Sequence, residues 1–170
     1  MRIGLISDTH IPSAGKELPS QVAETFRSVD MILHAGDIHV LSVLDWLQAI
    51  APVLAARGNG DRDLPADPRL KDAQVIEIEG LRIGLSHGLS LPEDPPWRPL
   101  SKIMDREFGG RVDVYVFGDT HVEMIETHDG VLMVNPGSPT LPHNLVGKLG
   151  TVGMIEVSEG KAEARIIQLR

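Results

Sequence analysis

Short apolar runs alternate with helix-like spacing through the first third of the chain. Three strands and two helices are predicted there: strands over 2–7, 31–35 and 53–56, a helix spaced by Val22, Phe26 and Val29, and a helix over 40–50. This order predicts a βαβαβ unit with a parallel sheet and right-handed crossovers. On the second helix, the spacing places Trp46 and Leu47 in the core.

The rest of the chain has the pattern of antiparallel strand pairs. The predicted pairs are 74–79 with 81–86, 122–128 with 131–135, and 150–157 with 161–169. A buried strand over 113–117, a helix over roughly 100–109 and a proline-rich loop over 88–99 complete the pattern. We therefore expect two packed mixed sheets with helices outside, formed by one domain over residues 1–170.

The composition is ordinary for a globular protein and restricts the chemistry of any bound ion. Apolar residues make up 42% of the chain and charged residues 24%, so disorder is not expected. Because cysteine is absent, a metal would be held by imidazole, carboxylate, amide or water. The chain begins on a predicted strand, and no apolar run approaches the roughly 20 residues of a membrane span, so we expect a cytoplasmic protein without a membrane partner.

The formal charge of −8 excludes an extended nucleic-acid groove, which requires clustered lysine and arginine. It does not exclude an anionic substrate. Two divalent ions would add about four positive charges at one point, and a bound ion dominates the potential of its own site.

Polar residues gather where the predicted strands end. They are Asp8 and His10 after the first strand, Asp37 after the second, Asn59 after the third, His87 after 81–86, and Asp119 and His121 after 113–117. In open α/β sheets the loops at the carboxyl ends of strands converge to form sites. We therefore expect these side chains to meet.

The residue types predict a pair of metal ions. Carboxylates, imidazoles and an amide suit Mn²⁺, Zn²⁺, Fe²⁺ or Ni²⁺ better than Ca²⁺. A single carboxylate such as Asp37 is able to bridge two ions, and an ion pair generates hydroxide near neutral pH for in-line attack on phosphorus. The sequence has no glycine-rich phosphate loop and no GxSxG or GxGxxG motif.

In chain order the motifs are Asp8-Thr9-His10, Gly36-Asp37, Gly58-Asn59, His87 and Gly118-Asp119-Thr120-His121. Each is weak alone, but this series at these strand ends resembles the calcineurin-like metallophosphoesterases, in particular their small bacterial and archaeal phosphodiesterase branch. The resemblance covers nearly the whole chain. It implies a four-layer αββα sandwich, two divalent ions with Mn²⁺ favoured, and a homo-oligomer.

The resemblance also implies a role for each ligand. Asp8, His10, Asp37 and His121 would hold one ion, and Asp37 would bridge to a second ion held by Asn59, His87 and Asp119. Catalysis is assigned to Asp37, Asn59, His87 and Asp61, the last as a partner that orients a ligand or a metal-bound water.

Two positions depart from the family pattern. Asp119 stands where the family has the first histidine of GHTH, and a carboxylate differs from imidazole in charge and reach. Gly60 stands where nuclease and protein-phosphatase relatives have a histidine that assists the leaving group, so this chain has no such donor at that position. Asp119 is also interpreted, alternatively, as a residue that caps its loop without binding metal.

The remaining histidines have structural interpretations. His34 lies in a predicted buried strand and is expected to be a hydrogen-bonded core residue. His39 either opens the second helix or lies near the site. His128 and His143 are expected on the surface, although the family places the turn 135–138, which precedes His143, near the metals.

The favoured function is hydrolysis of a small phosphate ester, by phosphodiesterase or phosphatase action, through a hydroxide bound to two metal ions. The alternative is a non-catalytic scaffold of the same fold. The retromer scaffold subunit of eukaryotes shares that fold, and His10-Ile11-Pro12 with Leu18-Pro19 resembles its start. A nuclease is disfavoured because the chain is short, acidic and lacks a histidine at position 60.

Overall fold

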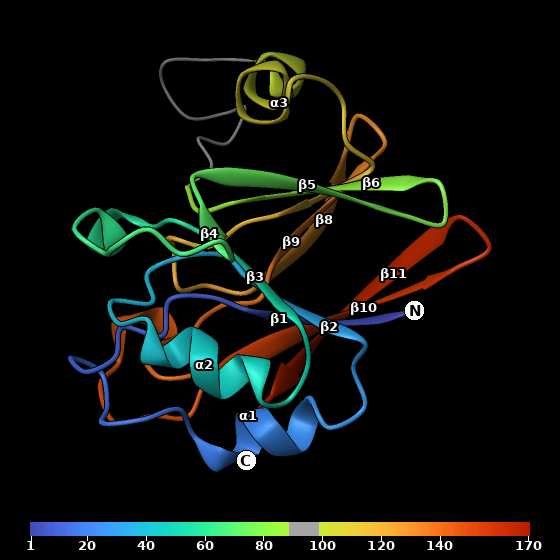
Figure 1. Cartoon of the computed structure of the whole chain (residues 1–170). Helices are drawn as coiled ribbons and strands as arrows, with labels where there is room; N and C mark the ends of the chain where they lie inside the picture. The colour runs from blue at the N-terminus through green and yellow to red at the C-terminus, as the bar shows by residue number, and fades with distance from the viewer. Residues whose placement is uncertain (89–98) are drawn as a thin grey trace.

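The computed structural model describes residues 1–88 and 99–170, which form two stacked β-sheets with helices on both outer faces (Figure 1). The proline-rich loop predicted over 88–99 lies, except for its two end residues, outside the described residues. In the described part of the chain, no helix is long and apolar enough to cross a membrane.

The first sheet has six strands, and its centre is parallel. In spatial order they are β11 (Lys161–Gln168), β10 (Thr151–Ser158), β1 (Arg2–Ile6), β2 (Met31–His34), β3 (Val53–Ala56) and β4 (Leu70–Lys71). Strands β1 to β4 are parallel, and the β10–β11 hairpin pairs antiparallel with β1. The parallel βαβαβ unit is confirmed. Strand β4 was not predicted, because two residues show no periodicity.

The second sheet has five strands and is also mixed. Its order is β5 (Ala73–Ile78), β6 (Leu81–Ser86), β7 (Val114–Val116), β9 (Val131–Asn135) and β8 (Met124–His128). Strands β6, β7 and β9 are parallel, whereas β5–β6 and β8–β9 are antiparallel hairpins. All three predicted hairpins are therefore present in the structure.

The helices complete four layers. Helices α1 (Ser20–Thr25) and α2 (Ser42–Gln48) cover the first sheet, and α3 (Leu100–Phe108) covers the second (Figure 1). Three separate apolar clusters fill the three spaces between these layers. The αββα sandwich predicted from the family resemblance is confirmed.

Strand β1 shows how alternation along one strand supports two cores. Ile3 and Leu5 face the second sheet, and Ile6 faces the helices. All three are fully buried, which stabilises the fold by roughly 1.5–3 kcal/mol for each side chain. A Cβ atom at Gly4 would lie 2.9 Å from ring carbons of Phe26 in α1, so the helix packs directly on the strand backbone.

One residue on α2 was misplaced by the sequence pattern. Leu47 is fully buried as predicted, but Trp46 is 38% exposed. The helix lies on the outermost layer and buries only one face, and adjacent residues on a helix point about 100° apart. The prediction for Trp46 was therefore wrong.

Candidate metal centre

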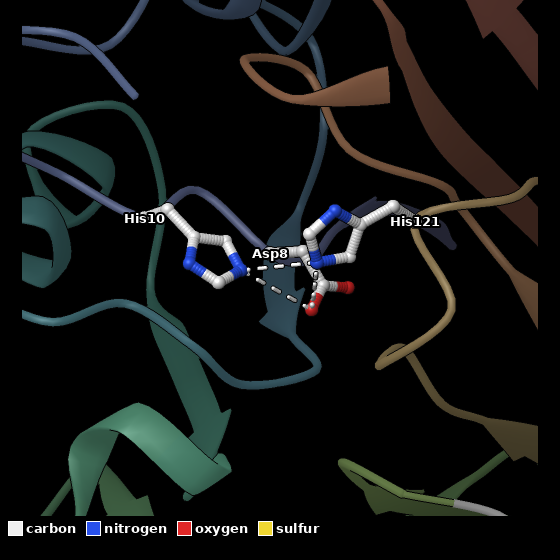
Figure 2. A group of neighbouring side chains, drawn as sticks. All are labelled: Asp8, His10 and His121. Atoms are coloured by element: carbon white, nitrogen blue, oxygen red, sulfur yellow. Dashed lines mark hydrogen bonds and ion pairs between the residues drawn. The ribbon is translucent and has the colours of Figure 1, made fainter. Parts of the chain in front are cut away.

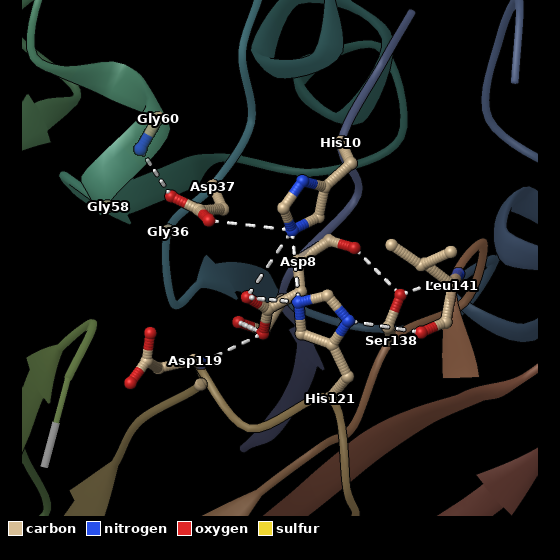
Figure 3. A network of polar contacts seen from close by, with 12 residues as sticks. Asp8, His10, Gly36, Asp37, Gly58, Gly60, Asp119, His121, Ser138 and Leu141 are labelled. Atoms are coloured by element: carbon tan, nitrogen blue, oxygen red, sulfur yellow. Dashed lines mark hydrogen bonds and ion pairs between the residues drawn. The ribbon is translucent and has the colours of Figure 1, made fainter. Parts of the chain in front are cut away.

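The predicted ligands converge where strands of both sheets end. Asp8, Asp37 and Asn59 follow β1, β2 and β3 of the first sheet, while His87 and Asp119 follow β6 and β7 of the second. Figure 3 shows side chains from both groups facing one another across a common space. The expectation that these strand ends meet is therefore met by the structure.

The first ligand group consists of Asp8, His10 and His121 (Figure 2). The Nε2 atoms of His10 and His121 lie 3.1 Å apart, and Asp8 Oδ1 lies 3.9 Å from the first and 3.5 Å from the second. Two ligands at about 2.1 Å from one ion are separated by about 3.0–3.4 Å at octahedral or tetrahedral angles. The distances of 3.1 and 3.5 Å are close to this range, and the distance of 3.9 Å is longer, so the three side chains could hold a single ion after a small adjustment of Asp8 or His10.

Asp37 joins this group to a second one. Its Oδ2 lies 3.4 Å from His10 Nε2, and its Oδ1 lies 3.5 Å from His87 Nε2. Asp119 Oδ1 is 3.4 Å from the same His87 nitrogen and accepts a hydrogen bond of 3.2 Å from Asn59 Nδ2. The two carboxylate oxygens of Asp37 therefore face two different sets of ligand atoms.

Two buried atoms at the centre of the site support a bound cation. In the described part of the chain, Asp8 Oδ1 and His87 Nε2 are buried and have no hydrogen-bond partner. The other polar atoms of the same side chains are bonded: Asp8 Oδ2 accepts from Ser7 Oγ at 2.6 Å and from the Asp119 N–H at 3.1 Å. Leaving a buried polar atom unpaired is costly, so these two atoms fit metal ligands.

Backbone carbonyls orient two of the imidazoles. The Nδ1 atom of His87 lies 2.7 Å from the carbonyl oxygen of Ala35, and Nδ1 of His121 lies 3.2 Å from that of Leu141. A carbonyl only accepts, so each Nδ1 carries the proton and each Nε2 presents its lone pair to the site. Metal-binding histidines are held in this way.

The charge of the site favours cations. Burial lowers the pKa of His10, but the nearby carboxylates of Asp8 and Asp37 outweigh this effect, so the pKa is raised above its usual value. The same buried carboxylates that stabilise a proton on His10 would stabilise a divalent ion in its place. Metal binding would displace that proton.

The backbone at the ligands is in an uncommon conformation. Positive φ angles occur at Asp8 (52°), His10 (47°), Asp37 (56°), Asp119 (71°) and His121 (58°). Left-handed backbone is unfavourable for residues with a side chain and is concentrated at functional sites. Because five proposed ligands have this left-handed conformation, we infer that the site requires the backbone conformation of these loops.

Asp61 fixes the loop that carries Asp37. Its fully buried carboxylate accepts hydrogen bonds from the backbone N–H groups of Ile38 (3.3 Å), His39 (2.8 Å) and Gly58 (2.8 Å). It therefore ties the loop after β2 to the turn η1 (Asn59–Asp61) after β3. The structure shows Asp61 holding backbone, whereas we expected it to orient a ligand side chain or a water.

His39 lies beside the first ligand group. Helix α2 begins at Ser42, so His39 does not open it. Its ring centroid is 4.4 Å from that of His10, and it forms a triple of potential ligands with His10 and Asp37. A Cβ atom at Gly60 would overlap the His39 ring, so His39 fills the space beside position 60. Sequence spacing gave no signal that separates this position from a helix start.

Two further residues support the centre from the turn 135–138. The hydroxyl of Ser138 donates to the backbone carbonyl of Asp8 at 2.7 Å (Figure 3). Asn135 Nδ2 donates to the backbone carbonyl of Gly118 at 2.9 Å. The side chain of His143 is half exposed and pairs with Glu123 at 3.0 Å. The turn therefore lies near the site as the resemblance implied, whereas the His143 side chain is on the surface.

His34 is a hydrogen-bonded core residue, as predicted. The Gly36 N–H donates to its Nδ1 at 3.1 Å, so the proton is on Nε2, which lies 3.1 Å from Thr9 Oγ1. The side chain is fully buried, and burial lowers its pKa to about 3. Protonating Nδ1 would break the hydrogen bond from Gly36, the residue directly before Asp37.

This burial predicts how the stability depends on pH. Because the pKa of His34 is about 3 in the folded chain and about 6.5 in the unfolded chain, the unfolded chain binds the extra proton between these values. The contribution of neutral His34 to the free energy of unfolding is complete above pH 6.5. It is lost as the pH falls, by up to about 1.4 kcal/mol for each pH unit. Chemical denaturation of metal-free protein between pH 7 and 4.5 should show a steeper decline for the wild type than for His34→Gln. Equal slopes would contradict this prediction.

Comparison with known proteins agrees with the fold. Residues 1–160 match the model of the calcineurin-like phosphoesterase superfamily domain. A protein of Methanothermobacter thermautotrophicus named "Probable metallophosphoesterase" is 40% identical over 143 residues, which cover 84% of this chain and 79% of that protein. A "Phosphodiesterase" of Methanocaldococcus jannaschii is 28% identical over 153 residues, covering 81% of this chain and 83% of that protein.

A solved structure shares the whole architecture. Vacuolar Protein Sorting 29 from Cryptosporidium parvum superimposes with a TM-score of 0.69 at 25% identity, and the match covers 99% of this chain and 97% of that chain.

The fold and the site together define a hydrolase that acts on phosphoric ester bonds and carries a cluster of metal-ligating side chains. The chain belongs to the calcineurin-like phosphoesterase superfamily.

Proposed function

We propose that the chain hydrolyses a small phosphate ester with the aid of two divalent ions. The observation that carries this proposal is the position of Asp37, whose two oxygens face His10 and His87 at 3.4 and 3.5 Å. A carboxylate between two ligand sets suits a bridge between two ions. The first ion would be held by Asp8, His10, Asp37 and His121, and the second by Asp37, Asn59, His87 and Asp119.

When bound, such an ion pair supplies hydroxide near neutral pH and neutralises charge on the phosphoryl group. The protein holds the ligands in place before the substrate arrives: the Gly60 N–H, 2.8 Å from Asp37 Oδ1, fixes the bridging carboxylate, and Asp61 fixes the backbone next to Asp37. The carbonyls of Ala35 and Leu141 aim His87 and His121. Such preorganisation reduces the cost of reaching the transition state.

The mixture of ligands favours Mn²⁺ over Zn²⁺. Three carboxylates and one amide oxygen accompany three imidazoles in the proposed set, and oxygen ligands suit Mn²⁺ whereas nitrogen and sulfur ligands suit Zn²⁺. With no cysteine to contribute, the thiolate sites typical of structural zinc are absent from the chain. We propose that the protein acts in the cytoplasm on a phosphodiester or phosphomonoester.

A scaffold function remains the alternative, and the apolar surface near the site favours it. Leu145 and Val146, which follow the short helix η2 (Pro142–Asn144), are 57% and 78% exposed. A scaffold would use such residues to bind a partner protein and would not need a complete ligand set. The unpaired Asp8 Oδ1 and His87 Nε2 favour the enzyme.

Metal removal separates the two functions. Protein stripped with a chelator should lose hydrolysis of bis(p-nitrophenyl) phosphate and regain it on addition of Mn²⁺, because the ligands alone provide no nucleophile. Activity is measured from released nitrophenolate, and circular dichroism confirms that the stripped protein remains folded. If a folded, Mn²⁺-loaded protein hydrolysed neither this diester nor p-nitrophenyl phosphate, the scaffold would be favoured.

Replacing Asp119 by histidine should change the preference between metals. Asp119→His exchanges a carboxylate for an imidazole 3.4 Å from His87 Nε2, so the second set of ligands becomes richer in nitrogen. We expect binding of Zn²⁺ relative to Mn²⁺ to strengthen by about tenfold, the lower part of the range for altered metal surroundings. Metal content after dialysis against equal concentrations of both ions measures the effect.

The matched control is Asp129→His, because Asp129 is also exposed and also has a positive φ, but lies in the β8–β9 turn. Asp129→His should leave the ratio of bound Zn²⁺ to bound Mn²⁺ unchanged. An unchanged ratio in Asp119→His as well would show that Asp119 caps its loop and does not bind metal.

A further inference from the structure

A pocket of about 280 Å³ opens beside Asn59 and His87, two of the residues proposed to hold the second ion. The turn after β3, the β4–β5 connection, the end of β6 and the last turn of α3 contribute to its lining. Ligand pockets for small molecules start at about 300 Å³, so this one suits a small chemical group. It lies next to the second ligand set, so a part of the substrate beyond the reacting phosphoryl group has room there.

Four charged residues line this pocket, and three of them have partners. Arg57 donates from Nη1 to the carbonyl of Asp61 at 2.6 Å, and its Nε lies 3.6 Å from Asp72 Oδ1. Glu107 pairs with Arg106 at 2.6 Å. Arg57 is thereby used to hold the turn that carries Asn59, and the charge of Glu107 is compensated.

Arg62 is the fourth, and its charge is not compensated within the described residues. No carboxylate oxygen in those ranges lies within 4.0 Å of its guanidinium, and the residue is exposed. It directly follows Asp61, whose buried carboxylate fixes the turn, so the backbone of Arg62 is anchored while its side chain lines the pocket. A guanidinium presents a planar set of donors that binds phosphate or carboxylate with two hydrogen bonds.

We propose that Arg62 binds a second anionic group in the leaving portion of the substrate. The substrates would then be small phosphate esters in which the departing alcohol itself carries a phosphate or carboxylate. This rests on the proposed function, because the ions would take the scissile phosphoryl group and leave the pocket for the rest. The chain has a net charge of −8, and a guanidinium beside the ions would add local positive charge for the second anion.

Binding of inert phosphonates tests the proposal without turnover. Calorimetry on the Mn²⁺-loaded protein would compare propane-1,3-diphosphonate with propylphosphonate, which lacks the second anion. We expect the diphosphonate to bind at least about tenfold more tightly, as a hydrogen-bonded charge pair allows. Arg62→Gln should reduce this preference to below about threefold, and Arg27→Gln, an exposed arginine that follows α1, should preserve it. A third ligand, 4-phosphonobutyrate, shows whether a carboxylate replaces the second phosphonate.

The outcomes distinguish this proposal from the function on which it rests. If the wild type bound both phosphonates equally, or if Arg62→Gln weakened both by the same factor, Arg62 would not recognise a second anion. If propylphosphonate did not bind to the Mn²⁺-loaded protein at all, both the metal site and this proposal would be overturned. Denaturation curves of the variants confirm that each is folded.

Discussion

Asp37→Asn is expected to lower kcat/KM for an aryl phosphodiester at least about 100-fold and to leave the protein folded. Loss of a residue that only orients a metal ligand costs about 10- to 100-fold, and Asp37 would contact both ions directly. An amide is neutral and presents one oxygen, so it neither neutralises nor bridges two cations. Steady-state kinetics with excess Mn²⁺, together with metal analysis, measure the effect.

Asp105→Asn is the matched control, because Asp105 is an exposed carboxylate on α3, away from the ligands. It should retain wild-type activity. Wild-type turnover and metal content in Asp37→Asn would show that the ligand assignment is wrong at its centre.

Asp61→Ala should have the largest effect on stability among the substitutions considered. It removes a buried acceptor from the N–H groups of Ile38, His39 and Gly58. Each buried N–H left without a partner costs about 1–3 kcal/mol, so we expect a loss of roughly 2–5 kcal/mol. For a chain of this size that corresponds to a decrease in Tm of about 5–15 °C. Urea denaturation of metal-free protein isolates this effect from metal binding.

Asp63→Ala provides the comparison, since Asp63 is an exposed aspartate two residues away on the same turn. Its effect should be within about 0.5 kcal/mol, as for most surface substitutions. If both variants were equally stable, the hydrogen bonds of Asp61 would contribute nothing to the fold. A stable but inactive Asp61→Ala would instead support a direct role in catalysis, as expected from the sequence.

Much of the fold was predictable because its strands are short, apolar and bounded by glycine or by polar residues. The short apolar run over residues 2–7 identified β1, and Ile3, Leu5 and Ile6 are buried because this strand lies between two layers. Where the prediction was wrong, the local pattern carried too little information. Trp46 is apolar and next to a buried residue, and only the position of α2 on the outer layer decides that it is exposed.

The convergence of the ligands was predictable for a topological reason, since carboxyl ends of parallel strands meet at one edge. The spacing of residues in the sequence did not indicate which groups hold the ligand side chains in position. The carbonyls of Ala35 and Leu141 exist at every residue, so no sequence signal marks them as partners of His87 and His121. The proximity of His39 to His10 likewise depends on a positive φ of 65° that the residue type does not reveal.

The span of sequence that the centre connects has a consequence for biosynthesis. Asp8 is held by Ser138, 130 residues later, and His121 is oriented by the carbonyl of Leu141. A nascent chain that has not yet released these residues from the ribosome lacks both supports, even if β1, β2 and β3 have already paired. Asp8 and His121 therefore gain these supports only after Leu141 has left the ribosome.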